Sequence, residues 1–248
     1  MNIWVPEAAL VANSDPLPVL VYIHGGAFFG GNNAKWDEDG GYIANEQNII
    51  VVKINYRLGV LGFWHLDTKE EGQDFQGNWG ILDQRLGLKW IYENIAAFGG
   101  DPNLITISGC SAGGQSVWIH LQEEPSWEYF QKAIVFAHPG GRLVYRGNLH
   151  IYRFFLGIPY FYKDQAIGFY SGNAKNMNCT TDAGEMDMAC LRETSVDDLM
   201  AGCWSTNLLL NNGPWAESLK YQMVTQMGEP YAPVIDQEVV TDHSQSLK

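Results

Sequence analysis

Four continuous apolar runs constrain the fold of this chain more than any other feature of its sequence. The runs are residues 17–24, 49–56, 104–108 and 132–137. A run without alternating polar residues is typical of a β-strand buried on both faces, as in a parallel sheet covered by helices. We therefore expect these runs to be strands of one mostly parallel sheet.

Helical patterns alternate with the apolar runs. From residue 81 to 97 apolar side chains recur every three to five positions, and the Gly-Gly-Asp-Pro turn at 99–102 ends the pattern. The predicted helices are residues 41–47, 81–97 and 115–121, with a short acidic helix at 195–200. Residues 17–137 therefore predict an open α/β sheet. In residues 138–248 the pattern weakens, and no second domain can be separated there.

Composition excludes several classes of protein. The chain has 248 residues, of which 46% are hydrophobic, so it can bury a core and is not disordered by composition. Its net charge is −13 and it has no basic run to follow a phosphate backbone, which argues against a nucleic-acid partner. No apolar stretch approaches the ~18 residues of a membrane span. We expect a soluble globular protein.

The segment Gly109–Gly113 fits the pattern Gly-x-Ser-x-Gly. It lies between a predicted strand and a predicted helix, where this pattern forms a sharp turn that lifts the serine hydroxyl above the sheet. A bare pentapeptide also occurs by chance as an ordinary glycine-rich turn, but the strand and helix around it favour catalysis. Ser111 is therefore the candidate nucleophile.

A second glycine-rich turn, His24-Gly25-Gly26-Ala27-Phe28, follows the first predicted strand. Alone it is an ordinary loop, and His24 fits a structural hydrogen-bonding role better than that of an acid or base. Combined with the serine turn it supplies the other part of an acyl-transfer site. We expect the backbone N–H groups of Gly25, Gly26 and Ala112 to form an oxyanion hole.

The chain contains four cysteines, too few for a disulfide scaffold. Cys179 and Cys190 stand 11 residues apart in a polar, turn-rich stretch and can close one surface loop. Asn178-Cys179-Thr180 is also a glycosylation sequon. Both features favour an oxidising compartment.

These motifs resemble the type-B carboxylesterase and cholinesterase family of α/β-hydrolases. The phrases that carry the resemblance are, in chain order, His24–Phe28, Asn55–Gly59, Gly77–Gln84, Phe98–Pro102 and the serine turn, followed more weakly by Cys190–Arg192 and Ala232–Asp236. The resemblance covers most of the chain. It implies an α/β-hydrolase fold, with a mostly parallel central sheet flanked by helices, and it supports a small disulfide loop between Cys179 and Cys190.

The resemblance also implies a function. We expect hydrolysis of small-molecule carboxylic esters through an acyl-enzyme on Ser111, with a histidine that relays protons and a carboxylate that orients it. We expect no cofactor and no metal ion. A secretory route follows as well, so the protein is expected to be secreted or to lie in the lumen of the secretory pathway, with glycosylation at Asn178.

The chain departs from the family pattern in three places. Cys110 stands where the family usually has a glutamate, so a small apolar thiol replaces an acidic contact. The phrase at 152–160 resembles one found near the start of such enzymes. The family's triad acid and histidine lie well downstream of the serine, and we expect them beyond Lys248. Residues 1–248 are therefore expected to be a partial α/β-hydrolase domain that lacks both residues.

No other histidine or acid in the chain has a spacing that suggests a catalytic role. Those considered and set aside are His65, His120, His138, His150, His243, Glu123, Glu124, Glu217 and Glu238. Two alternatives to a serine esterase remain open. One is a cholinesterase-like adhesion or binding protein that keeps the fold without turnover. The other is a gene fragment whose product does not fold stably.

Overall fold

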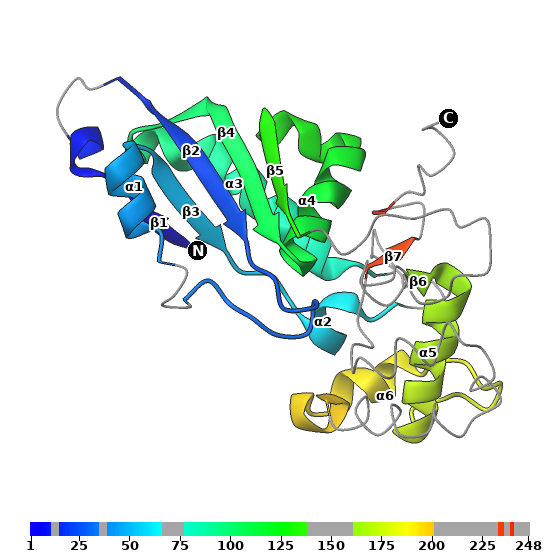
Figure 1. Cartoon of the computed structure of the whole chain (residues 1–248). Helices are drawn as coiled ribbons and strands as arrows, with labels where there is room; N and C mark the ends of the chain where they lie inside the picture. The colour runs from blue at the N-terminus through cyan, green and yellow to red at the C-terminus, as the bar shows by residue number, and fades with distance from the viewer. Residues whose placement is uncertain are drawn as a thin grey trace, which may run out of the picture.

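The computed structural model describes residues 1–10, 15–34, 39–65, 77–137, 161–200, 233–235 and 239–240. Its centre is a five-stranded sheet in the order β1-β3-β2-β4-β5 (Figure 1). The strands are β1 (Asn2–Trp4), β2 (Leu17–Ile23), β3 (Ile50–Ile54), β4 (Gly100–Cys110) and β5 (Lys132–Phe136). Strands β2 to β5 are mutually parallel, and only β1 pairs antiparallel, on β3.

The apolar runs form the parallel strands because both of their faces are covered. All five residues of β3 are buried, and Val19, Val21 and Ile23 of β2 are no more than 1% exposed. Helices α3 (Trp79–Asn94) and α4 (Ala112–Gln122) lie side by side against the sheet, while α1 (Gly41–Gln47) lies beside β3 (Figure 1). The predicted fold class, α/β with a mostly parallel sheet flanked by helices, is confirmed.

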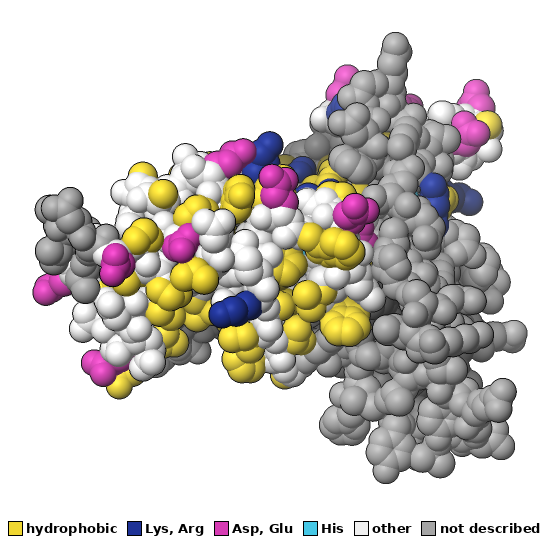
Figure 2. Space-filling model, turned by 90° about the horizontal axis from the view of Figure 1, so that it is seen from above, with side chains coloured by type: hydrophobic (Ala, Val, Ile, Leu, Met, Phe, Trp, Pro, Cys, Tyr) yellow, Lys and Arg dark blue, Asp and Glu magenta, His cyan; other side chains and the backbone are white. Residues whose placement is uncertain are grey.

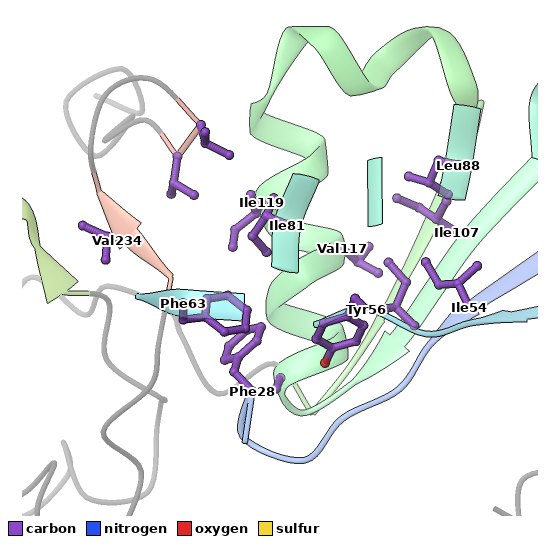
Figure 3. Close-up of a cluster of buried hydrophobic side chains, with 14 of the residues drawn as sticks. Phe28, Ile54, Tyr56, Phe63, Ile81, Leu88, Ile107, Val117, Ile119 and Val234 are labelled. Atoms are coloured by element: carbon purple, nitrogen blue, oxygen red, sulfur yellow. The ribbon is translucent and has the colours of Figure 1, made fainter. Parts of the chain in front are cut away.

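The hydrophobic core extends beyond the sheet. Its side chains line α3 and α4 and continue past Phe28 and Phe63 to Val234 (Figure 3). Val234 lies on β7 (Val234–Ile235), which pairs with β6 (Phe161–Tyr162). The buried side chain of Asn78 bonds both the N–H and the carbonyl of Val234, each at 2.8 Å, and so ties β7 to the start of α3.

A helical unit lies beside the end of the sheet at which the parallel strands finish (Figure 1). It consists of α5 (Lys163–Asn176) and α6 (Met188–Glu193). The Tyr170 hydroxyl of α5 donates to the Phe63 carbonyl, and its ring stacks on Trp64 at 5.0 Å. Phe63 ends the short helix α2 (Gly59–Phe63), so α5 is anchored to the segment that follows β3.

The structure agrees with most of the predicted elements. Strands β2, β3 and β5 and helix α1 lie within a residue or two of the predicted ranges, and β4 is longer than the predicted 104–108. The predicted helix at 81–97 is α3 followed by the 3₁₀ turn η3 (Ile95–Phe98). The sequence pattern does not predict helices α2, α5 and α6. Gly168 and Gly172 lower the helical signal of α5, whose apolar periodicity is weak.

Candidate active site

The topology brings the two glycine-rich turns to the same edge of the sheet. The serine turn follows β4 and the other turn follows β2, and these strands are parallel neighbours with Ile23 opposite Gly109. The chain passes from β2 to β3 on one side and then returns to β4 on the other. Ligands of open α/β sheets bind at the carboxyl ends of the strands where the strand order reverses in this way.

Ser111 occupies a strained position at the start of α4. Its backbone has φ 57° and ψ −123°, a combination that residues other than glycine rarely adopt. The turn is tight because α4 packs directly on the end of β2: a Cβ on Gly113 would lie 2.0 Å from the Ile23 carbonyl oxygen. A Cβ on Gly109 would lie 2.4 Å from Gly113. The glycines of the pattern are therefore needed for this backbone contact.

The other turn packs on the serine turn. A Cβ on Gly25 would lie 2.6 Å from the Cys110 carbonyl oxygen and 3.2 Å from the Ser111 Cβ. Gly26 has φ 119°, and its carbonyl accepts from the N–H groups of Phe29 and Gly30, three and four residues later. The backbones of the two turns are thus in direct contact, although Gly26 and Ser111 are 85 residues apart in sequence.

Several backbone N–H groups of these two turns are available to a ligand. Among the described residues, none accepts a hydrogen bond from the N–H groups of Gly25, Gly26 or Ala112. Ala112 is the first residue of α4, where helical N–H groups have no partner within the helix and the helix dipole favours negative charge. The sequence reasoning passed over Ala27, whose φ of 57° continues the left-handed turn after Gly26. Its N–H is a further candidate donor.

His24 holds the glycine turn through a hydrogen bond, the structural role that its sequence context suggests. It is 1% exposed, its Nδ1 donates to the Gly25 carbonyl at 2.9 Å, and its ring stacks on Tyr56 with centroids 4.5 Å apart. The Tyr56 hydroxyl donates to the His24 carbonyl at 2.9 Å. Burial, and to a lesser extent the neighbouring Tyr22, raises the pKa of Tyr56, which keeps this donor protonated.

An ion pair fixes α3 next to the site. The Arg57 guanidinium donates to Asp83 through Nε and Nη2, each at 2.7 Å, and the Arg57 backbone N–H also donates to Asp83 at 2.9 Å. The hydrogen bond to Asp83 raises the pKa of Arg57. Cβ atoms on Gly62 or Gly80 would lie within 2.6 Å of the Arg57 carbonyl oxygen, so α2 and α3 both pack closely on this residue.

The structure contains the predicted disulfide loop. Cys179 and Cys190 are bonded, with their Cα atoms 5.3 Å apart, and they join the end of α5 to α6. Asn178 is exposed in the turn immediately before Cys179, with φ 57°. Cys110 is a free, partly buried cysteine beside Ser111.

No described histidine or carboxylate forms a hydrogen bond with the side chain of Ser111. His120 is fully buried and bonds Gln84 and Ser126 instead, while His65 is also fully buried. Burial, together with nearby Arg85, lowers the pKa of His120 to about 3. Some of the residues that the sequence analysis set aside lie outside the described residues, namely His138, His150, His243, Glu217 and Glu238. The phrase at 152–160 also lies outside them.

The described residues present no other feature that indicates a ligand class. They contain no group of three or more His, Cys, Asp or Glu side chains that could hold a metal ion. No helix within the described ranges is long and apolar enough to cross a membrane. On the face shown in Figure 2, the Lys and Arg side chains that are drawn are scattered among acidic and apolar ones and form no basic patch.

Comparisons with known proteins bear on the family and on the fold. The sequence profile of the "Carboxylesterase family" matches residues 1–248. "Cholinesterase 1" of Branchiostoma lanceolatum is 35% identical over 83% of this chain and 52% of its own length. "Acetylcholinesterase" of Bungarus fasciatus is 31% identical over all of this chain and 35% of its own. A solved "PNB esterase" structure superposes with a TM-score of 0.72 at 29% identity, covering 95% of this chain and 42% of that one.

The matches extend over nearly the whole chain but over only part of each relative. The chain spans about half the length of the cholinesterase and less than half of the esterase structure. The profile match over every residue, with the fold and the serine turn in place, shows the family. The chain therefore belongs to the carboxylesterase family, a family of carboxylic ester hydrolases.

Proposed function

We propose that this protein hydrolyses carboxylic esters through an acyl-enzyme on Ser111. The observation that carries the proposal is the strained Ser111 backbone at the start of α4, packed against a glycine turn whose Gly25 and Gly26 N–H groups bond none of the described residues. Strain of this kind persists where the surroundings hold it and gathers at functional sites. The geometry supports a nucleophile at the carboxyl edge of the sheet, with the backbone N–H groups of the adjoining glycine turn close by.

The proposed reaction has two steps. The Ser111 hydroxyl oxygen attacks the ester carbonyl carbon, and the resulting oxyanion accepts hydrogen bonds from the N–H groups of Gly25, Gly26 and Ala112, with Ala27 as a further donor. Collapse of this intermediate expels the alcohol and leaves the acyl group on Ser111. Water then attacks the acyl-enzyme and releases the acid, which restores the serine hydroxyl.

The proton transfers in both steps require a histidine and an acid that orients it. None of the described histidines bonds Ser111, and His120 is committed to a separate buried network. We therefore propose that both residues come from parts of the full-length protein other than the described ranges. This is consistent with the share of the relatives that the chain covers.

We also propose that the protein follows the secretory route and carries a glycan on Asn178. The disulfide between Cys179 and Cys190 supports an oxidising compartment. Asn178 is exposed, and Thr180 completes its sequon. Treatment of the protein from its natural source with an N-glycosidase should lower its apparent mass and convert Asn178 to Asp in the corresponding peptide. An unmodified Asn178 would contradict this part of the proposal.

Fluorophosphonate labelling tests the proposed reaction. The probe should label the native full-length protein on the peptide that contains Ser111, and Ser111→Ala should abolish the labelling. Ser195→Ala is a matched control, because Ser195 also precedes a helix but its hydroxyl is bonded to Asp198 at 2.7 Å. This variant should label as the wild type does.

The same experiment separates the alternatives. A folded full-length protein that is not labelled would overturn the esterase proposal and favour the binding protein that keeps the fold without turnover. The unstable gene fragment is tested by a thermal scan of residues 1–248 expressed alone. A cooperative transition would exclude that alternative, whereas aggregation on expression would support it.

A further inference from the structure

A chain of four buried side chains links three elements behind the serine turn. Gln84, Ser116, His120 and Ser126 are all 0% exposed. They come from α3, from α4 and from the 3₁₀ turn η4 (Glu124–Tyr129). His120 lies 3.0 Å from Ser126 through Nδ1 and 3.0 Å from the Gln84 Oε1 through Nε2. Gln84 Nε2 lies 3.0 Å from the Ser116 hydroxyl, which in turn lies 3.0 Å from the Ala112 carbonyl oxygen.

The chemistry of these groups fixes the direction of every hydrogen bond. An amide oxygen can only accept, so His120 Nε2 carries the proton and His120 Nδ1 accepts from the Ser126 hydroxyl. The Gln84 amide nitrogen then donates to Ser116, whose own proton is directed to the Ala112 carbonyl. A doubly protonated imidazole would instead donate to the Ser126 hydroxyl, but burial, together with nearby Arg85, lowers the pKa of His120 to about 3, so the ring is neutral and Nδ1 accepts. The chain therefore donates in one direction, from η4 to Ala112.

The end of this chain lies next to the strained backbone of Ser111. Ala112 follows Ser111 directly and is the first residue of α4, and its N–H is one of the proposed oxyanion donors. The contact between Gly113 and the Ile23 carbonyl holds this turn against the sheet. The hydrogen bonds from Gln84 to Ser116 and from Ser116 to the Ala112 carbonyl tie the same turn to α3. A strained backbone needs such contacts on more than one side to keep its geometry.

We propose that Gln84 and Ser116 are positioning residues for the reaction on Ser111. By holding the Ala112 carbonyl, they fix the first turn of α4 and with it the Ser111 hydroxyl and the Ala112 N–H. The inference rests on the proposed function, because it concerns the rate of attack by Ser111. It goes beyond that function in assigning a role to two side chains that do not contact the substrate.

Two serines of the same chain provide a matched comparison. Ser116→Ala and Ser126→Ala each remove one fully buried hydroxyl from the network, so each should lower the melting temperature of the full-length protein by a similar few degrees. Only Ser116 touches the turn that carries the nucleophile. Ser116→Ala should therefore slow the phosphonylation step of fluorophosphonate labelling about tenfold to a hundredfold, with the probe's binding constant unchanged. Ser126→Ala should label within about twofold of the wild type.

Gln84→Met is a second variant that keeps the length of the side chain and removes both hydrogen-bonding groups. It should slow phosphonylation as Ser116→Ala does, and the double variant should be no slower than the slower single variant, because both act through one link. All labelling is measured well below the lowest melting temperature, so that each protein is folded. If the Ser116→Ala variant cannot be purified as a folded protein, Gln84→Met alone tests the positioning role.

The outcomes separate this inference from the proposed function. A wild-type protein that is not labelled on Ser111 overturns the proposed function itself. A labelled wild type together with Ser116→Ala and Gln84→Met variants that label at its rate overturns the positioning role. A rate loss in Ser126→Ala equal to that in Ser116→Ala also overturns it, because the network would then act only through stability.

Discussion

Acidification should destabilise this protein through His120, the buried histidine of α4. Burial lowers the pKa of His120 from 6.5 to about 3 in the folded protein. In the unfolded chain the same imidazole is solvated and binds a proton below about pH 6.5. Between these two values the unfolded state therefore holds one more proton than the folded state, and the free energy of unfolding falls as the pH falls.

The magnitude follows from the proton difference. Each pH unit below about 6.5 should reduce the folding equilibrium constant by about tenfold through this one group, until the pH approaches the folded pKa. Above about pH 7 neither state is protonated at His120, and the contribution is flat. The full-length protein should thus lose stability most steeply between pH 6 and pH 4.

The assay is urea denaturation of the full-length protein in half-unit steps from pH 7.5 to pH 4.5, on the wild type and on His120→Gln. The variant keeps polar groups at this position but cannot titrate, and it loses some stability at every pH because the bonds to Gln84 and Ser126 change. Other acids and histidines titrate in both proteins, so the difference between the two curves isolates His120. The ratio of the wild-type folding equilibrium constant to that of His120→Gln should fall by a factor of about ten per pH unit below pH 6.

Parallel curves for the two proteins over this whole range would refute the reasoning. They would mean that His120 has the same proton affinity in the folded and unfolded states, so that the ring reaches water or a charged partner. A ratio that rises on acidification would mean that the folded state binds the proton more tightly. The one-way direction of the buried hydrogen bonds would then be wrong as well.

Three further substitutions test other parts of the structure. Gly25→Ala should abolish fluorophosphonate labelling, because its Cβ would lie 2.6 Å from the Cys110 carbonyl oxygen, whereas Gly30→Ala, with no atom within 4 Å, should label normally. Equal labelling of both would contradict the packing of the two turns. Gly168→Ala should raise the free energy of unfolding by about 0.5 to 1 kcal/mol, because this helical glycine has open space around it; a loss in chemical denaturation would argue against a helix at this position. Cys190→Ser should lower the free energy of unfolding by about 3 kcal/mol, because the short loop is no longer closed. Thermal unfolding without reductant measures this loss. No change would show that this loop is equally ordered without the bond.

The parallel strands were readable from the sequence because burial on both faces removes polar alternation. The same physics explains why residues 81–97 were readable as a helix, since its buried face repeats with the helical period. Helix α5 could not be read in this way. Two of its positions are glycine, and its fully buried face, which contains Ala166, Asn173 and Ala174 beside Tyr170, has small and polar side chains that give only a weak apolar signal.

The candidate site was predictable in its parts but not in its assembly. The pattern around Ser111 and the turn after β2 each have a recognisable spacing, yet the order of strands that makes them neighbours is a property of the whole sheet. Ala27 and Gln84 lie within phrases that resemble the family, but nothing in those phrases assigns either residue a role. Their positions depend on a left-handed turn and on helix packing, and neither leaves a mark in the local sequence.

At Gly25, Gly109 and Gly113 the atom nearest to an added Cβ would be a backbone atom. Elsewhere in the core, a substitution such as a larger residue beside Ile107 can be offset by a smaller neighbour, because both partners are side chains. A peptide carbonyl has no smaller version that mutation could supply. In a saturation mutagenesis scan these three positions should therefore stay intolerant in every genetic background, and suppressor mutations that rescue core variants should fail to rescue them.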